Sequence, residues 1–342
     1  MNYLFIIQGE GRGHLSQAIA LKEKLEKDGH HVEKAFIGTS PERTIPNYAK
    51  EVFGNKLATF RSPNFLKTPD KKGIKPGLSI LYNILLFPVF IHSIFLLRCE
   101  IRKKDYDYIV NFYDMIGGLS GALSFSKKKI ITISHQYFLG SSYFKFPKGY
   151  FLNKFFLKLH SGICSLGSSE IRALSFDTHP NQYNSKIKII PPLLREAIFN
   201  MEPEKGDFIL VYLLNSGWIK EIFKLAIKYP EISFKIFMDR KPEALSVLDN
   251  MLVFGLNQES FLHELSRCNS LITTAGFESQ CEAAFLGKMV YTLPCKNHFE
   301  QMCNAIDGER VGVSRSLTEF DSYSEMDSAQ NSVFRAWVLS DY

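Results

Sequence analysis

Hydrophobic and polar positions alternate along the chain between short apolar runs and longer stretches with helical spacing. The first run, Tyr3 to Gln8, is followed by Gly9 and then by Leu15 to Lys27, where apolar residues recur on one helical face. The same alternation predicts further strands at Val32 to Ile37, Tyr108 to Phe112, Ile130 to Ser134, Phe208 to Leu213, Ser233 to Met238, Met251 to Phe254, Ser270 to Thr273 and Val290 to Leu293. Strands that alternate with helices favour parallel sheets covered on both faces, so the predicted class is α/β.

Two domains are expected from the length of 342 residues, which is more than one core comfortably supports. Prolines and charges interrupt the pattern around Ile190-Pro191-Pro192 and again from Glu202 to Gly206. We therefore expect an N-terminal domain over residues 1–198 and a C-terminal domain over 199–342. The tail turns amphipathic at Val333 to Leu339, which predicts a helix that packs back on the body.

Charged residues are distributed unevenly between the two halves of the chain. Residues 1–170 carry 24 Lys and Arg against 13 Asp and Glu, whereas residues 171–342 carry 17 against 22. A basic half can face nucleic acid, an anionic membrane or a phosphorylated substrate, but no nucleic-acid-binding motif is present, so we expect no nucleic-acid partner. The six cysteines show neither a CxxC pair nor metal-ligand spacing, and no cleavable signal peptide precedes them, which favours reduced thiols in the cytoplasm.

Two segments are unusually apolar. Ile80 to Leu97 contains no charged residue before Arg98 and barely reaches the roughly 20 residues that span a bilayer. Pro88 and several polar residues interrupt it, so we expect a buried helix or lid, with membrane contact as the alternative. Tyr143 to His160 interleaves Phe and Tyr with lysines, a composition typical of a helix at a membrane surface.

The first group of residues with chemical potential is Gly9-Glu10-Gly11-Arg12-Gly13-His14, between the first strand and the first helix. Glycines at this turn allow a ligand close to the backbone, and the helix start offers free N–H groups to an anion, so Gly11, Arg12 and Gly13 are candidate contacts for acceptor or phosphate. His14 could accept a proton. The glycine pattern also resembles a dinucleotide-binding fingerprint. A nicotinamide site requires an acidic residue at the end of the second strand, where this chain has Gly38-Thr39, so that interpretation is not favoured.

A second group begins where strand Ser270 to Thr273 runs into Thr274-Ala275-Gly276 and a predicted helix, Phe277 to Gly287. Backbone amides after Gly276, together with Thr274 and Ser279, could hold a diphosphate at the helix start. Glu282 lies one turn after Glu278 on the same face and suits the two hydroxyls of a ribose. Glu278 itself could simply stabilise the helix start.

A third group follows strand Val290 to Leu293 and Pro294, in His298-Phe299-Glu300-Gln301-Met302-Cys303-Asn304. Ligands of parallel sheets bind at the carboxyl ends of the strands. A carboxylate beside an amide, Glu300 and Gln301, suits the recognition of sugar hydroxyls there.

Together these segments resemble a known family. The run Gly276 to Ala283, followed by Gly287, Pro294, Glu300-Gln301 and Asn304, is similar to the donor signature of UDP-dependent glycosyltransferases with two Rossmann-like domains facing a cleft, the GT-B fold. The loop Gly9 to His14 is similar to their amino-terminal loop. Within this family, the resemblance is to the plant and animal UDP-glycosyltransferases and to the N-acetylglucosaminyltransferase of the peptidoglycan precursor. Thr274 and Glu278 depart from the plant pattern, which has histidine and asparagine there.

The resemblance implies roles for individual residues. His14 corresponds to the general base for the acceptor hydroxyl, and Asp114 to an aspartate that orients it. Glu282 corresponds to the ribose ligand. The diphosphate contacts correspond to Ser279, Thr274 and the Gly276 backbone, the sugar-binding pair to Glu300 and Gln301, and the backbone that meets the nucleotide base to Gly255 and Leu256.

The expected activity is therefore transfer of a hexose or N-acetylhexosamine from a nucleotide diphosphate sugar to an acceptor hydroxyl, with inversion and without a metal. No cofactor is expected, because the nucleotide sugar is a co-substrate. The acceptor is expected to be a lipid-linked glycan or a small molecule, and the protein to be cytoplasmic with peripheral contact to the inner membrane face. The alternatives are a UDP-N-acetylglucosamine 2-epimerase and a non-catalytic nucleotide-sugar-binding subunit that works with a membrane partner.

Overall fold

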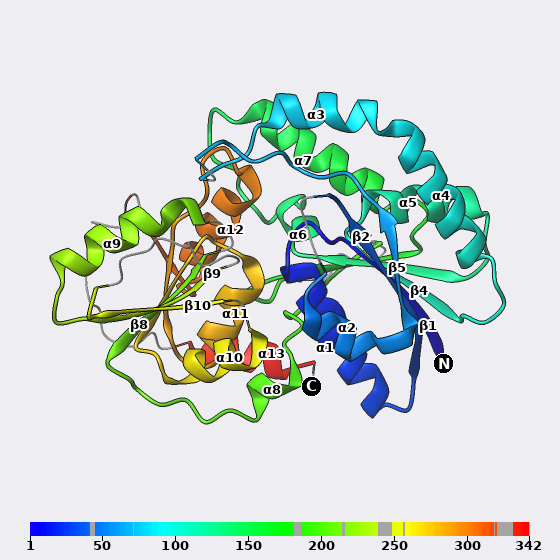
Figure 1. The fold of residues 1–342 in the computed structure, drawn as a ribbon. Coiled ribbons are helices and arrows are strands. Elements are labelled where there is room, and N and C mark those ends of the chain that lie inside the picture. Colours follow the sequence, from blue (N-terminus) through cyan, green and yellow to red (C-terminus); the bar gives the residue numbers. More distant parts are fainter. Residues whose placement is uncertain are drawn as a thin grey trace. The chain divides into compact units, whose positions relative to one another are not determined.

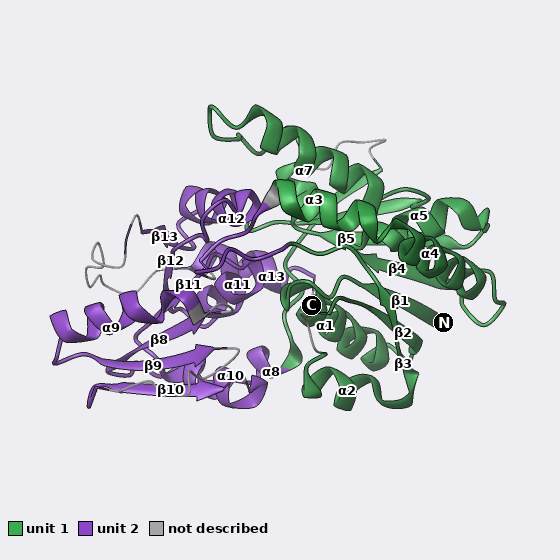
Figure 2. Cartoon of the chain, turned by 45° about the horizontal axis from the view of Figure 1, so that its top comes forward, with its two compact units in different colours: residues 1–65, 76–196 green, residues 66–75, 197–342 purple. Residues whose placement is uncertain are grey.

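The computed structural model describes residues 1–41, 45–70, 72–180, 186–213, 216–238, 248–255, 257–317, 319 and 331–341. The chain forms two compact units (Figure 2). Unit 1 comprises Met1–Phe65 and Pro76–Glu196, and unit 2 comprises Leu66–Lys75 and Ala197–Tyr342. The chain thus passes to unit 2 at Glu196/Ala197, and ten residues from within the first half belong to unit 2, whereas the sequence led us to expect contiguous domains.

Unit 1 contains a parallel sheet whose strands are ordered β3-β2-β1-β4-β5-β6-β7 (Figure 1). The strands are β1 (Asn2–Ile7), β2 (His31–Thr39), β3 (Leu57–Arg61), β4 (Tyr108–Phe112), β5 (Lys129–Ser134), β6 (Glu170–Leu174) and β7 (Ile187–Ile190). The central strand β1 is buried from Leu4 to Ile7 because helices cover both faces of a parallel sheet. Its hydrophobic run is continuous for that reason.

The helices of unit 1 connect these strands. They are α1 (Gly13–Lys27), α2 (Asn47–Phe53), α3 (Pro76–Leu85), α4 (Phe87–Ile101), α5 (Met115–Ser124), α6 (Gln136–Leu139) and α7 (Phe151–Cys164). The short helix α8 (Glu196–Phe199) follows β7, and all of it except Glu196 belongs to unit 2. Gly9 explains how closely the loop after β1 packs, because a Cβ atom there would lie 1.8 Å from the carbonyl oxygen of Gly38 on β2. Only glycine fits at this turn.

Unit 2 contains a second parallel sheet, ordered β10-β9-β8-β11-β12-β13. Its strands are β8 (Phe208–Leu213), β9 (Ser233–Met238), β10 (Met251–Gly255), β11 (Ser270–Thr273), β12 (Met289–Thr292) and β13 (Arg315–Ser316). Its longer helices are α9 (Ile219–Lys228), α10 (Gln258–Arg267), α11 (Phe277–Phe285), α12 (Phe299–Arg310) and α13 (Ser332–Leu339). Two parallel α/β sheets of this kind confirm the predicted fold class.

The C-terminal helix α13 packs on unit 2, as its amphipathic pattern predicted. Phe334 and Val338 are buried, the Asn331 side chain donates to the carbonyl of Ala284 at 3.4 Å, and the Arg335 guanidinium lies 4.9 Å from the Phe285 ring centroid. Helix α11 is therefore covered by α13 along its C-terminal turn.

The expectation of a buried helix or lid at Ile80 to Leu97 is wrong in one respect, since α3 is largely exposed and only α4 is partly buried. The segment forms two helices, α3 and α4, that meet at an angle of 68°. Helix α4 buries Phe90 and Leu97, but Ile84 and Leu85 of α3 are 62% and 72% exposed. Apolar side chains lie on every face of these two helices, so packing one face of a helix against the protein leaves the others exposed.

Candidate functional site

The glycine-rich loop of unit 1 leads into α1, where His14 is the second residue of the helix. Its side chain is buried, and its imidazole stacks on Tyr113 with 5.6 Å between ring centroids. Burial lowers the pKa of His14 to about 4. The imidazole is therefore neutral at physiological pH, which is the form that can accept a proton.

The partner of His14 is Gln17 on the same helix. Nδ1 of His14 lies 3.3 Å from Oε1 of Gln17, and both side chains are buried. Because a carbonyl oxygen only accepts hydrogen bonds, this contact places the imidazole proton on Nδ1. The lone pair of the neutral ring is then on Nε2. Sequence reasoning did not identify Gln17, although a residue three positions along a helix shares the face of His14.

Asp114 follows β4 and is fully buried. Its Oδ2 accepts from the Ser62 hydroxyl at 2.7 Å, and its Oδ1 accepts from the backbone N–H of Gly117 at 2.9 Å, which caps α5. Burial raises the pKa of Asp114 to about 6, and these hydrogen bonds oppose the rise. In the described part of the chain, His14 is thus paired with Gln17, while Asp114 holds the start of α5 and the Ser62 loop.

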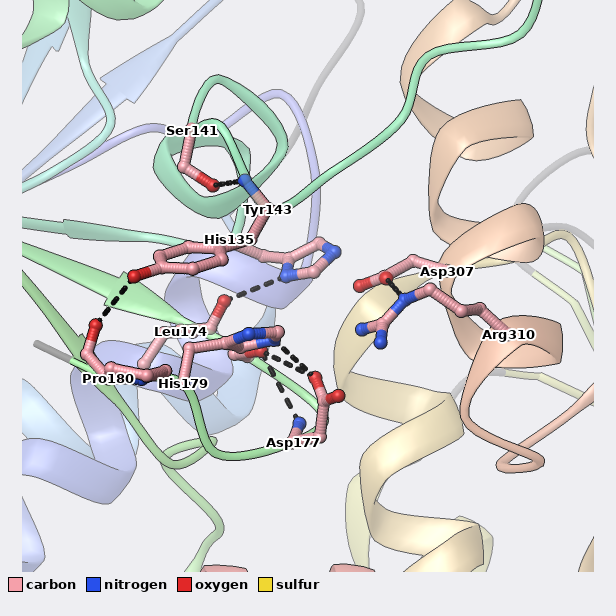
Figure 3. Close-up of polar contacts among 10 residues, drawn as sticks. His135, Ser141, Tyr143, Leu174, Asp177, His179, Pro180, Asp307 and Arg310 are labelled. Atoms are coloured by element: carbon pink, nitrogen blue, oxygen red, sulfur yellow. Dashed lines mark hydrogen bonds and ion pairs between the residues drawn. The ribbon is translucent and has the colours of Figure 1, made fainter.

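A second polar cluster of unit 1 follows β5 and β6 (Figure 3). His135 comes directly after β5, and its Nδ1 lies 2.8 Å from the carbonyl oxygen of Leu174 at the end of β6. Three residues later along the chain, Asp177 accepts from Nε2 of His179 at 2.8 Å. The carboxyl ends of parallel strands lie at one edge of a sheet, so this cluster and the His14 loop share an edge. This cluster was not among the predicted sites, because the residues of β6 do not show the apolar pattern of a buried strand.

The loop Gly11, Arg12 and Gly13 lies partly exposed before α1. Arg12 is the N-cap residue, and no side chain caps the helix from that position. A Cβ atom on Gly11 would meet nothing within 4 Å. The loop therefore leaves space beside the first amides of α1, in agreement with an approach of a polar group to the backbone.

The candidate donor site of unit 2 is built around the start of α11. Gly276 is its N-cap, without a side-chain cap, and Ala275 before it has a left-handed φ of 59°. The Ser279 hydroxyl lies 3.2 Å from that of Thr273 and donates to the carbonyl of Gly276 at 3.1 Å. Amides at an uncapped helix start are suited to an anion.

The remaining predicted donor residues differ in exposure. Thr274 and Glu282 are buried, and so is Glu278, whose carboxylate is not presented to solvent. Gly255 ends β10 and is exposed. Leu256 lies outside the described residues.

Glu300 and Gln301 lie in the first turn of α12 and are both partly exposed. Oε1 of Gln301 accepts from the backbone N–H of Cys295 at 2.8 Å. Its carboxamide orientation is therefore set by the loop after β12, and Nε2 is the remaining donor. Further along α12, the Asn304 side chain donates to the carbonyl of Ala275 at 3.1 Å, which ties α12 to the loop before α11.

On α12 itself, Asp307 is fully buried and forms an ion pair with Arg310 at 2.8 Å, which is also drawn in Figure 3. A buried carboxylate requires such a partner. Among the described residues, no group of three or more His, Cys, Asp or Glu side chains is arranged to hold a metal ion.

Unit 1 also exposes many large apolar side chains on α3, α4 and α7. The most exposed large apolar side chains of α7 are Phe151 at 78% and Leu152 at 64%, followed by Phe155 and Phe156. In both general views α3 and α7 run near each other on one side of unit 1 (Figures 1 and 2). Over the described residues, no single helix has the length and hydropathy to cross a membrane, and α3 with α4 meets the criterion only as a bent pair.

The comparisons with known proteins agree with this architecture. The family model described as glycosyl transferase family 1 matches residues 1–328. The glycotransferase of kitacinnamycin is 15% identical, with a TM-score of 0.60 and coverage of 99% of this chain and 90% of that one. Phytolacca americana UGT2 is 11% identical, with a TM-score of 0.59 and coverage of 99% and 89%.

A third solved structure, UDP-GlcNAc 2-epimerase from Neisseria meningitidis, is 14% identical, with a TM-score of 0.58 and coverage of 100% and 92%. No curated protein sequence matches the chain. Identities this low show the fold alone, whereas the family match extends over nearly the whole chain. The chain belongs to glycosyl transferase family 1, and it is a glycosyltransferase with the GT-B fold.

Proposed function

We propose that the protein transfers a hexose or N-acetylhexosamine from a uridine diphosphate sugar to an acceptor hydroxyl, with inversion and without a metal ion. His14 is the general base. The single observation that carries this proposal is the buried neutral imidazole of His14, whose Nδ1–H is held by Gln17. The arrangement leaves Nε2 as the atom that takes the proton.

In the proposed reaction, Nε2 of His14 removes the proton from the acceptor hydroxyl. The acceptor oxygen attacks the anomeric carbon on the face opposite the diphosphate, the bond from that carbon to the diphosphate oxygen breaks, and the electron pair leaves with the nucleoside diphosphate. The configuration at the anomeric carbon is inverted. Gln17 and the Tyr113 ring keep the imidazole in place, and the Asp114 carboxylate supports the loop rather than the base.

The donor is proposed to bind unit 2 through the start of α11 and α12. Amides after Gly276, together with Ser279, bind the diphosphate, and they stabilise the negative charge that grows on the departing group. Glu282 contacts the ribose. Glu300 accepts hydrogen bonds from the sugar hydroxyls, while Nε2 of Gln301 donates to them.

The acceptor is proposed to be lipid-linked and to be reached at an anionic membrane. Residues 115–169 contain seven lysines and no acidic residue, and residues 71–99 contain no acidic residue either. The exposed apolar side chains of α3 and α7 lie in these two stretches. Exposed apolar side chains in stretches whose only charged residues are basic suit the interface of an anionic bilayer. The protein is accordingly proposed to act at the cytoplasmic face of the membrane.

The proposal is tested by incubating the protein with radiolabelled UDP-sugars and a membrane lipid extract. The expected product is a labelled lipid whose new glycosidic bond has the anomeric configuration opposite to that of the donor. An epimerised sugar formed without any acceptor would favour the epimerase, and nucleotide-sugar binding without turnover would favour a non-catalytic subunit. Retention of the donor configuration in the product would contradict the role of His14 as general base.

A further inference from the structure

A small hairpin, Leu66–Lys75, belongs to unit 2 although the chain on both sides of it belongs to unit 1. Lys67 and Ile74 form an antiparallel bridge. The backbone N–H of Thr68 donates to the carbonyl of Gly73 at 2.9 Å, and the N–H of Gly73 donates back to the Thr68 hydroxyl at 3.0 Å. The described residues of the hairpin, 66–70 and 72–75, therefore form an ordered element with its own hydrogen bonds.

One side chain anchors the hairpin to α9. The Lys72 ammonium forms an ion pair with Glu221 in the first turn of α9, and it also lies 5.3 Å from the ring centroid of Trp218. The side chains of Lys72 and Glu221 are 22% and 27% exposed, so this pair is less screened by water than a surface ion pair. A cation–π contact adds to the attraction.

The backbone of the hairpin contacts the loop between β12 and α12. The carbonyl of Lys72 accepts from the N–H of Lys296 at 3.0 Å, and Gly73 forms a parallel bridge with Lys296. A Cβ atom on Gly73 would lie 2.5 Å from the carbonyl oxygen of Lys296. The two backbones are thus too close for any side chain at position 73.

The contacted loop directly precedes the proposed sugar-binding pair. Next to Lys296, the N–H of Cys295 donates to Oε1 of Gln301, and Asn297 has a left-handed φ of 61°. The loop therefore sets the orientation of the Gln301 carboxamide. A shift of Lys296 would move Cys295 and so disturb Gln301.

We infer that the Leu66–Lys75 hairpin positions the sugar-binding part of the donor site, with Lys72 and Gly73 acting through Lys296 on Gln301. This inference rests on the proposed function, because it assigns the hairpin to the same donor site. The hairpin acts on the sugar and not on the nucleotide, since the proposed diphosphate contacts lie at the start of α11 and are held by Thr273 and Ser279. Lys72 and Gly73 are positioning residues.

The test compares the affinities of UDP and of UDP-sugars in the full chain. Gly73→Ala is expected to weaken binding of UDP-glucose and UDP-N-acetylglucosamine by about tenfold and to leave UDP within about twofold, as measured by isothermal titration calorimetry. The matched control is Gly77→Ala, where an added Cβ atom would meet nothing within 4 Å. This control is expected to leave both affinities unchanged.

A second variant keeps the inference testable if Gly73→Ala fails to fold. Lys72→Met retains an unbranched apolar side chain near Trp218 but removes the charge that pairs with Glu221, so a smaller loss of the same selectivity is expected. Hydrogen exchange of the Lys296 amide should also be faster in Gly73→Ala than in Gly77→Ala, with or without a nucleotide. Unchanged exchange, or equal effects on UDP and UDP-sugars, would overturn the inference alone. Failure of the wild-type protein to bind any of these nucleotides would instead overturn the proposed function, and the inference with it.

Discussion

Nδ1 of His14 lies 3.3 Å from Oε1 of Gln17, so a neutral carboxamide orients the candidate base. A carboxylate at the same place would stabilise the imidazolium more strongly than this neutral carboxamide does. Burial lowers the pKa of His14 to about 4, and the hydrogen bond to Gln17 opposes only part of that fall. The contact between His14 and Gln17 therefore predicts the tautomer of the imidazole and the change in its pKa when Gln17 is replaced.

The tautomer can be observed directly. With Nδ1 protonated by its contact to Gln17, the imidazole ¹⁵N spectrum of the protein should show Nε2 of His14 as the unprotonated nitrogen at pH 7. In Gln17→Leu this preference should be lost without a change in the spectra of distant histidines such as His263. A His14 ring with Nε2 protonated in the wild-type protein would contradict the proposed orientation.

Replacement of Gln17 by glutamate should raise the pKa of His14. A carboxylate beside the imidazole favours its charged form, and a change of one pKa unit or more is expected. Titration followed by NMR measures the shift, and the acid limb of the pH–rate profile should move to higher pH by the same amount. An unmoved profile despite a raised pKa would show that His14 does not titrate in the reaction.

Acidification should destabilise the fold through His14. Its pKa is about 6.5 when unfolded and about 4 when folded, so the unfolded state binds more protons between these values, and the contribution of the neutral ring is lost as the pH falls below 6.5. Between pH 7.5 and 5 the loss is about 2 kcal/mol. Urea unfolding of His14→Asn should show a pH dependence weaker by about that amount.

Asp114 contributes with the opposite sign. Its folded pKa of about 6 lies above the usual value for an aspartate, so the folded state gains stability as the pH falls through this range. Asp114→Asn, measured in the same urea series, should therefore make the acid destabilisation steeper. A shallower pH dependence in this variant would contradict the assignment.

Substitutions on α7 should weaken membrane binding. Phe151→Ser with Phe155→Ser removes two exposed rings and is expected to lower the affinity for vesicles of phosphatidylglycerol by tenfold or more, since each buried aromatic side chain contributes about 1.5–3 kcal/mol. Vesicle flotation measures this. The matched control is Ile227→Ser on α9, which is 58% exposed in unit 2 and should bind as the wild-type protein does.

The charge of the same face can be tested separately. Lys154→Glu should weaken binding to anionic vesicles by roughly fivefold or more, because each lysine near such a surface contributes about 1 kcal/mol, and the effect should shrink at high salt. Equal flotation of all variants with anionic vesicles would contradict membrane binding through α3 and α7.

Much of the fold could be predicted from the sequence because buried parallel strands are continuous apolar runs. The nine predicted strands are all present, from β1 to β12. Strands β3, β6, β7 and β13 escaped prediction: β3 and β7 are partly exposed, β6 begins with Glu170 and contains Arg172, and β13 has two residues. The charged residues of β6 pair with each other and with Lys129, contacts that no local pattern reveals.

The candidate site shows the same limit. Its segments were predictable because glycines and polar residues follow strand ends, but the partners within it were not. Asp114 is directed to Ser62, which is 52 residues away in sequence, and the hairpin contact to Lys296 joins even more distant segments. Such pairings depend on tertiary packing. The exposure of α3 could not be predicted either, since an apolar sequence pattern does not show whether another part of the protein covers the helix.

The central claim is that His14 activates the acceptor hydroxyl, and the most direct measurement is the rate of sugar transfer by His14→Ala and His14→Gln at saturating UDP-sugar. Both variants are expected to bind UDP with wild-type affinity and to transfer sugar 10² to 10⁴ times more slowly, because a positioned base contributes about that factor. Transfer at the wild-type rate, with UDP binding intact, would contradict the account.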